Sequence, residues 1–173
     1  MIISVDKLKK FITTNEDKEV LEAKLQALEV LIRKYTNNNF QNRNIRYKCN
    51  AKGNKLDIIT PYLAVGDTVQ ISGSEFNNGL FVVDSVEDGI KLDNYLFDEE
   101  DVLVTKIEYP LDVQMGVVNM LKWDLDNRDK VGIASETISR HSVTYFNMDG
   151  DNSTIGYPKS LVGFLKQYMK ARF

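Results

Sequence analysis

The sequence predicts an α+β fold in which helices from the N- and C-terminal parts form the core and a small antiparallel β-barrel or sheet is inserted between them. Near both ends, apolar residues recur every three or four positions, as in helices buried on one side. The middle instead holds short β-branched runs separated by Asn-Gly and Asp-Gly pairs. The predicted domains are residues 1–44 with 108–173, which form the helical core, and residues 45–107, which form the β insert.

The N-terminal part predicts two helices. Ser4 is a suitable N-cap for a short helix over Val5–Ile12. Asn15 can cap a longer helix, which the asparagine run at 37–39 ends. The apolar stripe of this longer helix comprises Leu21, Leu25, Leu28, Ile32 and Tyr35.

The middle part predicts several short strands, since its runs rich in Val, Ile, Leu and Thr are bounded by turn residues. Strands at this spacing are typical of a small barrel or a curled sheet. The expected strands are Lys55–Thr60, Asp67–Ser72, Leu80–Val86, Ile90–Leu92 and Val102–Ile107.

The C-terminal part predicts two more helices and an extended arm. The first helix starts at Pro110, a residue that suits a first turn, and runs to about Asn127. Ile138–Phe146 is β-branched and aromatic enough for a strand or arm. The last helix opens at Tyr157-Pro158 and carries apolar residues on one face.

Composition argues against an enzyme. One cysteine, Cys49, and one histidine, His141, leave little for a metal site or a catalytic triad, and no phosphate-binding glycine loop or nucleophile elbow occurs. Both residues are interpreted as structural. Met148–Ser153 lacks the spacing of a calcium loop and is interpreted as a solvated turn. The acidic run 98–101 is interpreted as a solvated loop, with a metal site or docking patch as the less favoured alternative. No cofactor and no metal are expected.

Charge is divided unevenly along the chain. The net charge is −3 overall, made up of +2 over residues 1–44, −5 over residues 45–107 and zero over residues 108–173. A protein that grips nucleic acid presents a basic face, which this distribution does not indicate. The sequence also lacks an apolar run of the length that a signal peptide or membrane span needs. An aqueous compartment, the cytoplasm of the cell that makes the chain, is therefore expected.

Several segments resemble head–tail connector proteins of tailed bacteriophages. The N-terminal one is Ser4–Leu8, followed by a long helix that ends in Tyr35-Thr36-Asn37-Asn38-Asn39-Phe40. Tyr109–Val113 then opens a helix, as in that family. The most specific part is an arm, Gly132–Tyr145, that is similar to the family pattern Gly-x-x-Ser-Glu-x-Ile-x-x-x-Ser-Val-x-Tyr, together with Gly156-Tyr157-Pro158 before a terminal helix.

The resemblance implies a helical bundle core of three or four helices, assembled as a homo-oligomeric ring, commonly of twelve subunits, at the head–tail joint of the virion. Such adaptors dock on the portal protein, extend the channel through which DNA passes without specific binding, and offer a surface to the stopper or tail completion protein. No membrane partner is implied. The inserted β module departs from the shorter members of the family, so its contacts are left open.

Two hypotheses about interfaces follow. The arm Ser139–Phe146 is more apolar than a free surface strand, which predicts that it packs across the subunit boundary; the alternative is a hairpin folded onto its own helices. The last helix has one apolar and one basic face, which suits docking on an acidic portal surface. The candidate interface residues are Ser135, Glu136, Val143, Tyr145, Phe146, Tyr157, Leu161, Leu165, Tyr168, Lys166, Lys170 and Arg172.

A different function class remains open. The chain could be a tail-side completion protein or a weak nucleic-acid-binding module that uses the β insert, because small barrels often bind oligonucleotides. The insert offers the aromatic residues Tyr62, Phe76, Phe81 and Tyr95 for such a role. Its net charge of −5 opposes this interpretation.

Overall fold

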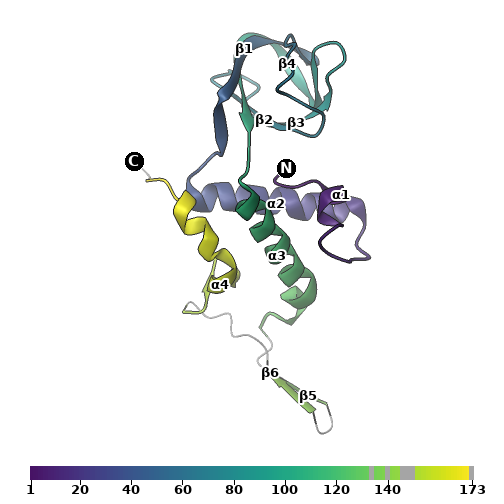
Figure 1. Cartoon of the computed structure of the whole chain (residues 1–173), viewed down its shortest axis with the longest axis vertical. Helices are drawn as coiled ribbons and strands as arrows, with labels where there is room; N and C mark the ends of the chain where they lie inside the picture. Colours follow the sequence, from purple (N-terminus) through teal and green to yellow (C-terminus); the bar gives the residue numbers. More distant parts are fainter. Residues whose placement is uncertain (133–134, 139–140, 145–150, 172–173) are drawn as a thin grey trace. The chain divides into compact units, whose positions relative to one another are not determined.

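The computed structural model describes residues 1–132, 135–138, 141–144 and 151–171. The chain forms two compact units. The sheet unit comprises Asn39–Tyr109 together with Met1, and the helical unit comprises Ile2–Asn38 and Pro110–Phe173. The chain therefore starts in the helical unit, passes through the sheet unit and returns (Figure 1).

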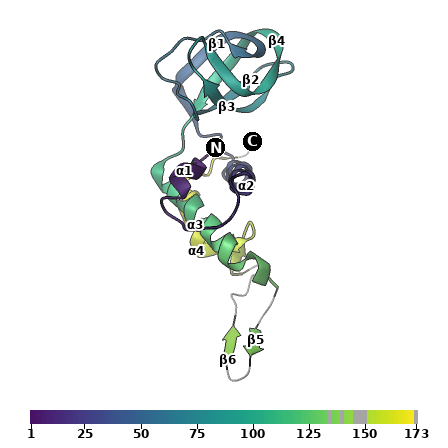
Figure 2. The ribbon, with the colours of Figure 1, turned by 90° about the vertical axis from the view of Figure 1, so that its right-hand side faces the viewer.

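The sheet unit is a four-stranded antiparallel sheet in the order β1-β4-β2-β3. The long strand β4 pairs with β1 along most of its length, with β2 near its C-terminal end and with β3 near its N-terminal end. Figure 2 shows the strands coiling around a common interior. The strands are β1 (Gln41–Leu56), β2 (Thr68–Ser72), β3 (Gly79–Ser85) and β4 (Ile90–Ile107).

The core of the sheet unit consists of side chains that point inward from all four strands. They include Leu56, Val69, Ile71, Val83, Ile90, Leu92, Leu96 and Val104, each 1% exposed or less. Gln41 pairs with Ile107, and the Glu108 amide donates to the Phe40 carbonyl at 2.9 Å. The sheet unit thus begins and ends at adjacent positions, which is what a module inserted between two segments of another unit requires.

Among the described residues, the helical unit contains two long α-helices, α2 (Lys18–Thr36) and α3 (Leu111–Asn127). Their buried faces hold Leu21, Leu25, Leu28 and Ile32 from α2 and Val113, Val117, Met120 and Leu121 from α3. The remaining elements are short: α1 (Val5–Leu8), η1 (Arg128–Lys130), β5 (Ser135–Ile138), β6 (His141–Thr144), β7 (Ser153–Thr154), β8 (Tyr157–Pro158), α4 (Lys159–Val162) and η2 (Gly163–Tyr168).

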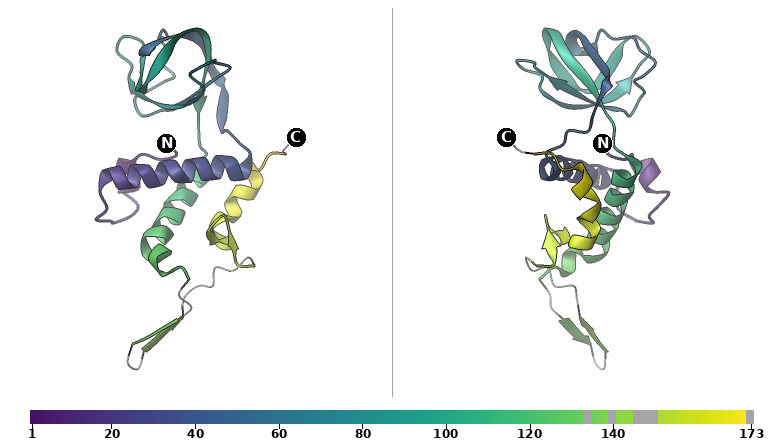
Figure 3. Two further views of the ribbon diagram at one scale, coloured as in Figure 1. Left: turned by 180° about the vertical axis from the view of Figure 1, so that it is seen from behind. Right: turned by 60° about the vertical axis from the view of Figure 1, so that its left-hand side comes forward.

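The expected helical bundle core is wrong. The four-stranded sheet is the largest regular element, and α1 and α4 have only four residues each. A bundle also requires helices that run nearly parallel or antiparallel over their length. Figures 1 and 3 show instead that α2 crosses α3 steeply, so the two helices contact each other only where they cross.

For the insert, the sequence left a barrel or an antiparallel sheet open; the sheet is observed, and the barrel is wrong. Within residues 39–109, all of which the structure describes, β1 pairs only with β4, so no pairing between β1 and β3 closes the sheet. Closure needs every strand to have two partners. The strands also differ in length from the expectation, because β1 starts at Gln41 and because Ile90–Leu92 and Val102–Ile107 are the two ends of the single strand β4.

Candidate functional site

A cluster of four side chains joins the end of α3 to β8. Trp123 and Asp124 belong to the last turn of α3, Arg128 follows this helix, and Tyr157 comes from β8. The Arg128 guanidinium lies 5.0 Å from the centre of the Trp123 ring and 4.8 Å from that of Tyr157. The rings of Trp123 and Tyr157 are 5.6 Å apart and tilted by 60°. We call these four residues the clamp.

Asp124 provides the negative charge of the clamp. Its Oδ1 accepts a hydrogen bond from Arg128 Nε at 2.7 Å and forms an ion pair with the same guanidinium, and its Oδ2 accepts one from the Tyr157 hydroxyl at 2.5 Å. Arg128 also donates to the Gly156 carbonyl at 3.0 Å. Burial, and next the bond to Asp124, raise the pKa of the Tyr157 hydroxyl, so this hydroxyl stays protonated and donates.

The local sequence explains the clamp. Asp124 and Arg128 are four residues apart and so meet on one face of a helix, and the positive charge of Arg128 suits the C-terminal end of α3. Tyr157 follows residues 131–155 in the sequence. The clamp therefore fixes the two ends of the segment that carries β5 and β6. Sequence reasoning found Tyr157 but missed Trp123, Asp124 and Arg128, whose signal is an acid–base pair at helical spacing beside the single tryptophan.

The arm segment contains an antiparallel hairpin. Strand β5 pairs with β6 in a register that places Glu136 opposite Val143 and Ser135 opposite Thr144. All four residues of β5 pair with residues of β6. The sequence interpretation treated Ser139–Phe146 as one extended arm, whereas the observed β6 covers His141–Thr144. Tyr145 and Phe146 lie outside the described residues.

The C-terminal candidates divide between core and surface. Tyr157 and Leu165 are 4% and 0% exposed, so they belong to the core of the helical unit, and Leu161 is half-buried. Lys166 and Lys170 are exposed. The basic face of the last segment is therefore accessible, while part of its apolar face is occupied within the unit. Arg172 lies outside the described residues.

The last described residues are tied to both long helices. The Tyr168 hydroxyl donates to the carboxylate of Asp112 in the first turn of α3, at 2.7 and 2.8 Å to the two oxygens. At the end of α2, the Asn38 side chain donates to the Tyr168 carbonyl at 3.1 Å, and the Lys170 amide donates to the Thr36 carbonyl at 2.8 Å. These bonds satisfy polar groups that a helix end leaves without a partner inside the helix.

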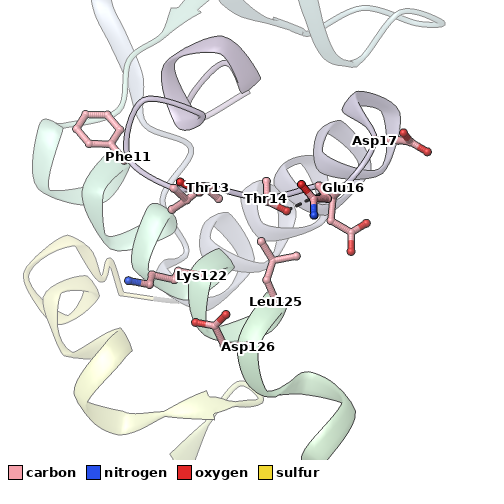
Figure 4. Close-up of a pocket in the computed structure, with 10 residues that line it drawn as sticks. Phe11, Thr13, Thr14, Glu16, Asp17, Lys122, Leu125 and Asp126 are labelled. Carbon is pink, nitrogen blue, oxygen red and sulfur yellow. Dashed lines mark hydrogen bonds between the residues drawn. The ribbon is translucent and has the colours of Figure 1, made fainter.

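An open groove of about 750 Å³ lies between the α1–α2 connection and α3 (Figure 4). Residues 11–17 form one wall, and Lys122, Leu125 and Asp126 form the other. Figure 4 shows Asp17 and Asp126 on different sides of the groove, so their carboxylates do not converge on one point. Asp17 and Asp126 therefore do not form a carboxylate pair of the kind that hydrolytic enzymes use.

The candidate reactive residues have ordinary surroundings. Cys49 is buried, and burial, followed by the charge of Asp57, raises the pKa of its thiol to about 12, which makes it a poor nucleophile. In the part of the chain that the structure describes, no three His, Cys, Asp or Glu side chains are grouped so as to hold a metal ion.

No helix over the described residues is long and apolar enough to cross a membrane. The side chain of His141 and residues 145–150 are outside the description.

The aromatic residues proposed for nucleic-acid binding differ in exposure. Tyr62, Phe76 and Tyr95 are 63%, 60% and 75% exposed, whereas Phe81 is partly buried against the core of the sheet unit.

No protein-family model matches the chain, and no curated protein matches it significantly.

Proposed function

We propose that the chain is a structural head–tail connector of a tailed bacteriophage or prophage, which assembles as a ring on the portal and offers a docking surface to the stopper or tail. The observation that carries this proposal is that one segment contains the β5–β6 hairpin and has both of its ends joined by the clamp. The segment with the family-like arm pattern is held at both ends, and its strands β5 and β6 pair with each other.

A hairpin of this kind suits contact between subunits. The outer edges of a two-stranded hairpin carry backbone donors and acceptors that another chain can pair with, and stable proteins cover such edges. A ring needs a heterologous contact, in which one surface of a subunit fits a different surface of its neighbour. In our proposal the hairpin of one subunit supplies the first surface, and the clamp holds together residues that precede and follow the segment carrying the hairpin.

The second contact in the proposal joins the C-terminal segment to the portal. Lys166 and Lys170 are exposed on a segment that is tied to α2 and α3. An anchored segment presents its lysines with little loss of conformational freedom, which favours docking on an acidic surface. The sheet unit, with its excess of carboxylates, would let DNA pass without adhesion.

Replacing residues 135–144 by a Gly-Ser linker of equal length tests the proposal. The variant should keep the melting temperature of the helical unit, because the replacement leaves α2, α3 and the clamp unchanged. It should lose ring formation, measured by light scattering with the portal present. The charge reversals Lys166→Glu and Lys170→Glu should instead spare contacts between subunits and weaken portal binding. A linker variant that still assembles like the parent chain would refute the role of the hairpin.

A further inference from the structure

Three aromatic side chains of the sheet unit are exposed. Two of them are in ring contact, and the third is two residues away from one of these in sequence. Phe76, Tyr95 and Phe97 are 60%, 75% and 60% exposed. The rings of Phe76 and Phe97 are 5.7 Å apart. Tyr95 and Phe97 are two residues apart on β4, so they share the face opposite to Leu96, which is 1% exposed and lies in the core. This face leaves aromatic surface in water, which is unfavourable unless a partner covers it.

The Phe76 loop is held against β4. The Asn77 side chain donates to the Phe97 carbonyl at 2.9 Å and accepts from the Phe97 amide at 2.8 Å, so it pairs with β4 as a strand residue would. Glu99 accepts from the Ser74 hydroxyl at 2.5 Å and from the Glu75 amide at 2.7 Å. Phe76 and Phe97 are therefore positioned before any partner arrives, which lowers the entropic cost of binding.

Carboxylates surround the aromatic residues. Glu75, Asp98, Glu99, Glu100 and Asp101 are close to them in sequence, and the lysines of the same region are Lys48 and Lys52. Lys48 pairs with Asp101 at 2.9 Å. A hollow of about 350 Å³ between residues 50–52 of β1 and residues 98–100 of β4 lies within this acidic rim. Hydrogen bonds, first that from Ser74, lower the pKa of Glu99, so the rim keeps this charge near neutral pH.

We propose that this aromatic and acidic surface is a docking site for a cationic segment of a partner protein, in which arginine or lysine side chains alternate with apolar ones. A guanidinium can stack on the exposed faces of Phe76 and Phe97. Glu99, which holds the Phe76 loop through the Ser74 hydroxyl and the Glu75 amide, and the other carboxylates of residues 75 and 98–101 supply the negative charge of this region. Nucleic acid and anionic lipid carry the wrong sign of charge for this rim. The inference is independent of the connector function.

Fluorescence anisotropy with two labelled peptides tests the proposal. The first peptide repeats Arg-Ala-Leu over about twelve residues, and the second has glutamate in place of arginine. The full-length chain should bind the first peptide with a micromolar dissociation constant that weakens as salt rises, and should not bind the second. The double variant Phe76→Ser/Phe97→Ser should weaken binding at least tenfold, and Glu75→Gln/Glu100→Gln should weaken it and flatten the salt dependence.

Tyr62→Ser is the matched control, because Tyr62 is a comparably exposed aromatic on a different loop, and it should leave affinity unchanged. Each variant is first checked for an unchanged melting transition of the sheet unit. Equal binding of both peptides, or an equal loss with Tyr62→Ser, would overturn the proposal. So would a labelled oligothymidylate that binds the chain by itself and loses this binding in the Phe76→Ser/Phe97→Ser variant, since this result would assign the surface to nucleic acid.

Discussion

The guanidinium of Arg128 lies over two neighbouring aromatic rings, 5.0 Å from the centre of the Trp123 ring and 4.8 Å from that of the Tyr157 ring. Trp123 and Arg128 precede the hairpin segment, and Tyr157 follows it. One side chain thus joins the residues at which that segment leaves and rejoins the helical unit. The clamp is also easy to follow in solution, because Trp123 is the single tryptophan of the chain.

Arg128→Ala should lower the free energy of unfolding of the helical unit by about 1–2 kcal/mol, since it removes two cation–π contacts and the ion pair with Asp124. Urea unfolding followed by Trp123 fluorescence measures the change. Lys18→Ala is the control, because the Lys18–Glu22 pair is an exposed 3.8 Å contact within one helix and should be worth less than about 0.5 kcal/mol. Equal effects of both variants would contradict the clamp.

Ile155→Asn should stabilise the helical unit. Ile155 has a φ of 51° in the two-residue turn between β7 and β8, and Gly156 has a φ of 80°. A β-branched residue is strained in this left-handed region, whereas Asn-Gly is the preferred pair of such turns. The expected gain in unfolding free energy is about 1 kcal/mol. Ile155→Val keeps the β-branch and should give no gain. A loss of stability in the asparagine variant would show that the side chain of Ile155 matters more than its backbone strain.

The helical unit should lose stability at alkaline pH through Tyr168. The hydrogen bond to Asp112 is the main cause that raises the pKa of Tyr168 from 10.0 to about 12. A raised pKa in the folded state stabilises the protein fully below pH 10, and this contribution disappears as the pH rises toward 12. Tyr168→Phe should therefore flatten the pH dependence of the unfolding midpoint in this interval. A variant with the same steep alkaline loss as the parent would contradict the bond to Asp112.

Gly116→Ala should destabilise the helical unit although alanine favours helices. On propensity alone the substitution in α3 would gain about 1 kcal/mol. A Cβ on Gly116, however, would lie 2.1 Å from a ring atom of Phe164, so the ring must move away. We expect a net loss of about 1–3 kcal/mol. Combining Gly116→Ala with Phe164→Leu should recover most of the loss, and a stabilised single variant would contradict the close packing of α3 against η2.

The sequence was most informative where a regular apolar pattern decides the structure. The stripe from Leu21 to Ile32 and the start and end of α3 were predicted correctly, because burial of one face defines a helix. The middle of β4 was missed: residues 93–95 and 97–101 are polar or aromatic and mostly exposed, and their strand pairing depends on β1, which lies far away in the sequence. The last helix was expected to be regular, but it changes to a 3₁₀ turn at Gly163.

The candidate site residues also divide into those that a local pattern predicts and those that depend on contacts with distant segments. Exposed lysines such as Lys166 could be placed on a basic face from helical spacing alone. The burial of Tyr157 and Leu165 could not, because it depends on contacts with α3 and α2 rather than on the pattern of their own segment. The register of the β5–β6 hairpin, with Glu136 opposite Val143, likewise depends on its turn and not on composition.

The arrangement of the C-terminal segment changes how its role should be tested. A deletion of residues 168–173 would remove the Tyr168–Asp112 bond and the bond between Lys170 and Thr36, so it would damage the fold as well as any docking surface. The exposed charge reversals at Lys166 and Lys170 avoid this problem.

The proposed role is tested most directly by electron microscopy of the purified full-length protein mixed with the portal of the same virion. The account predicts a closed ring of copies seated on the portal, with the β5–β6 hairpin of each copy against its neighbour. A portal that gains no additional density at saturating protein, while the protein itself stays monomeric, would contradict it.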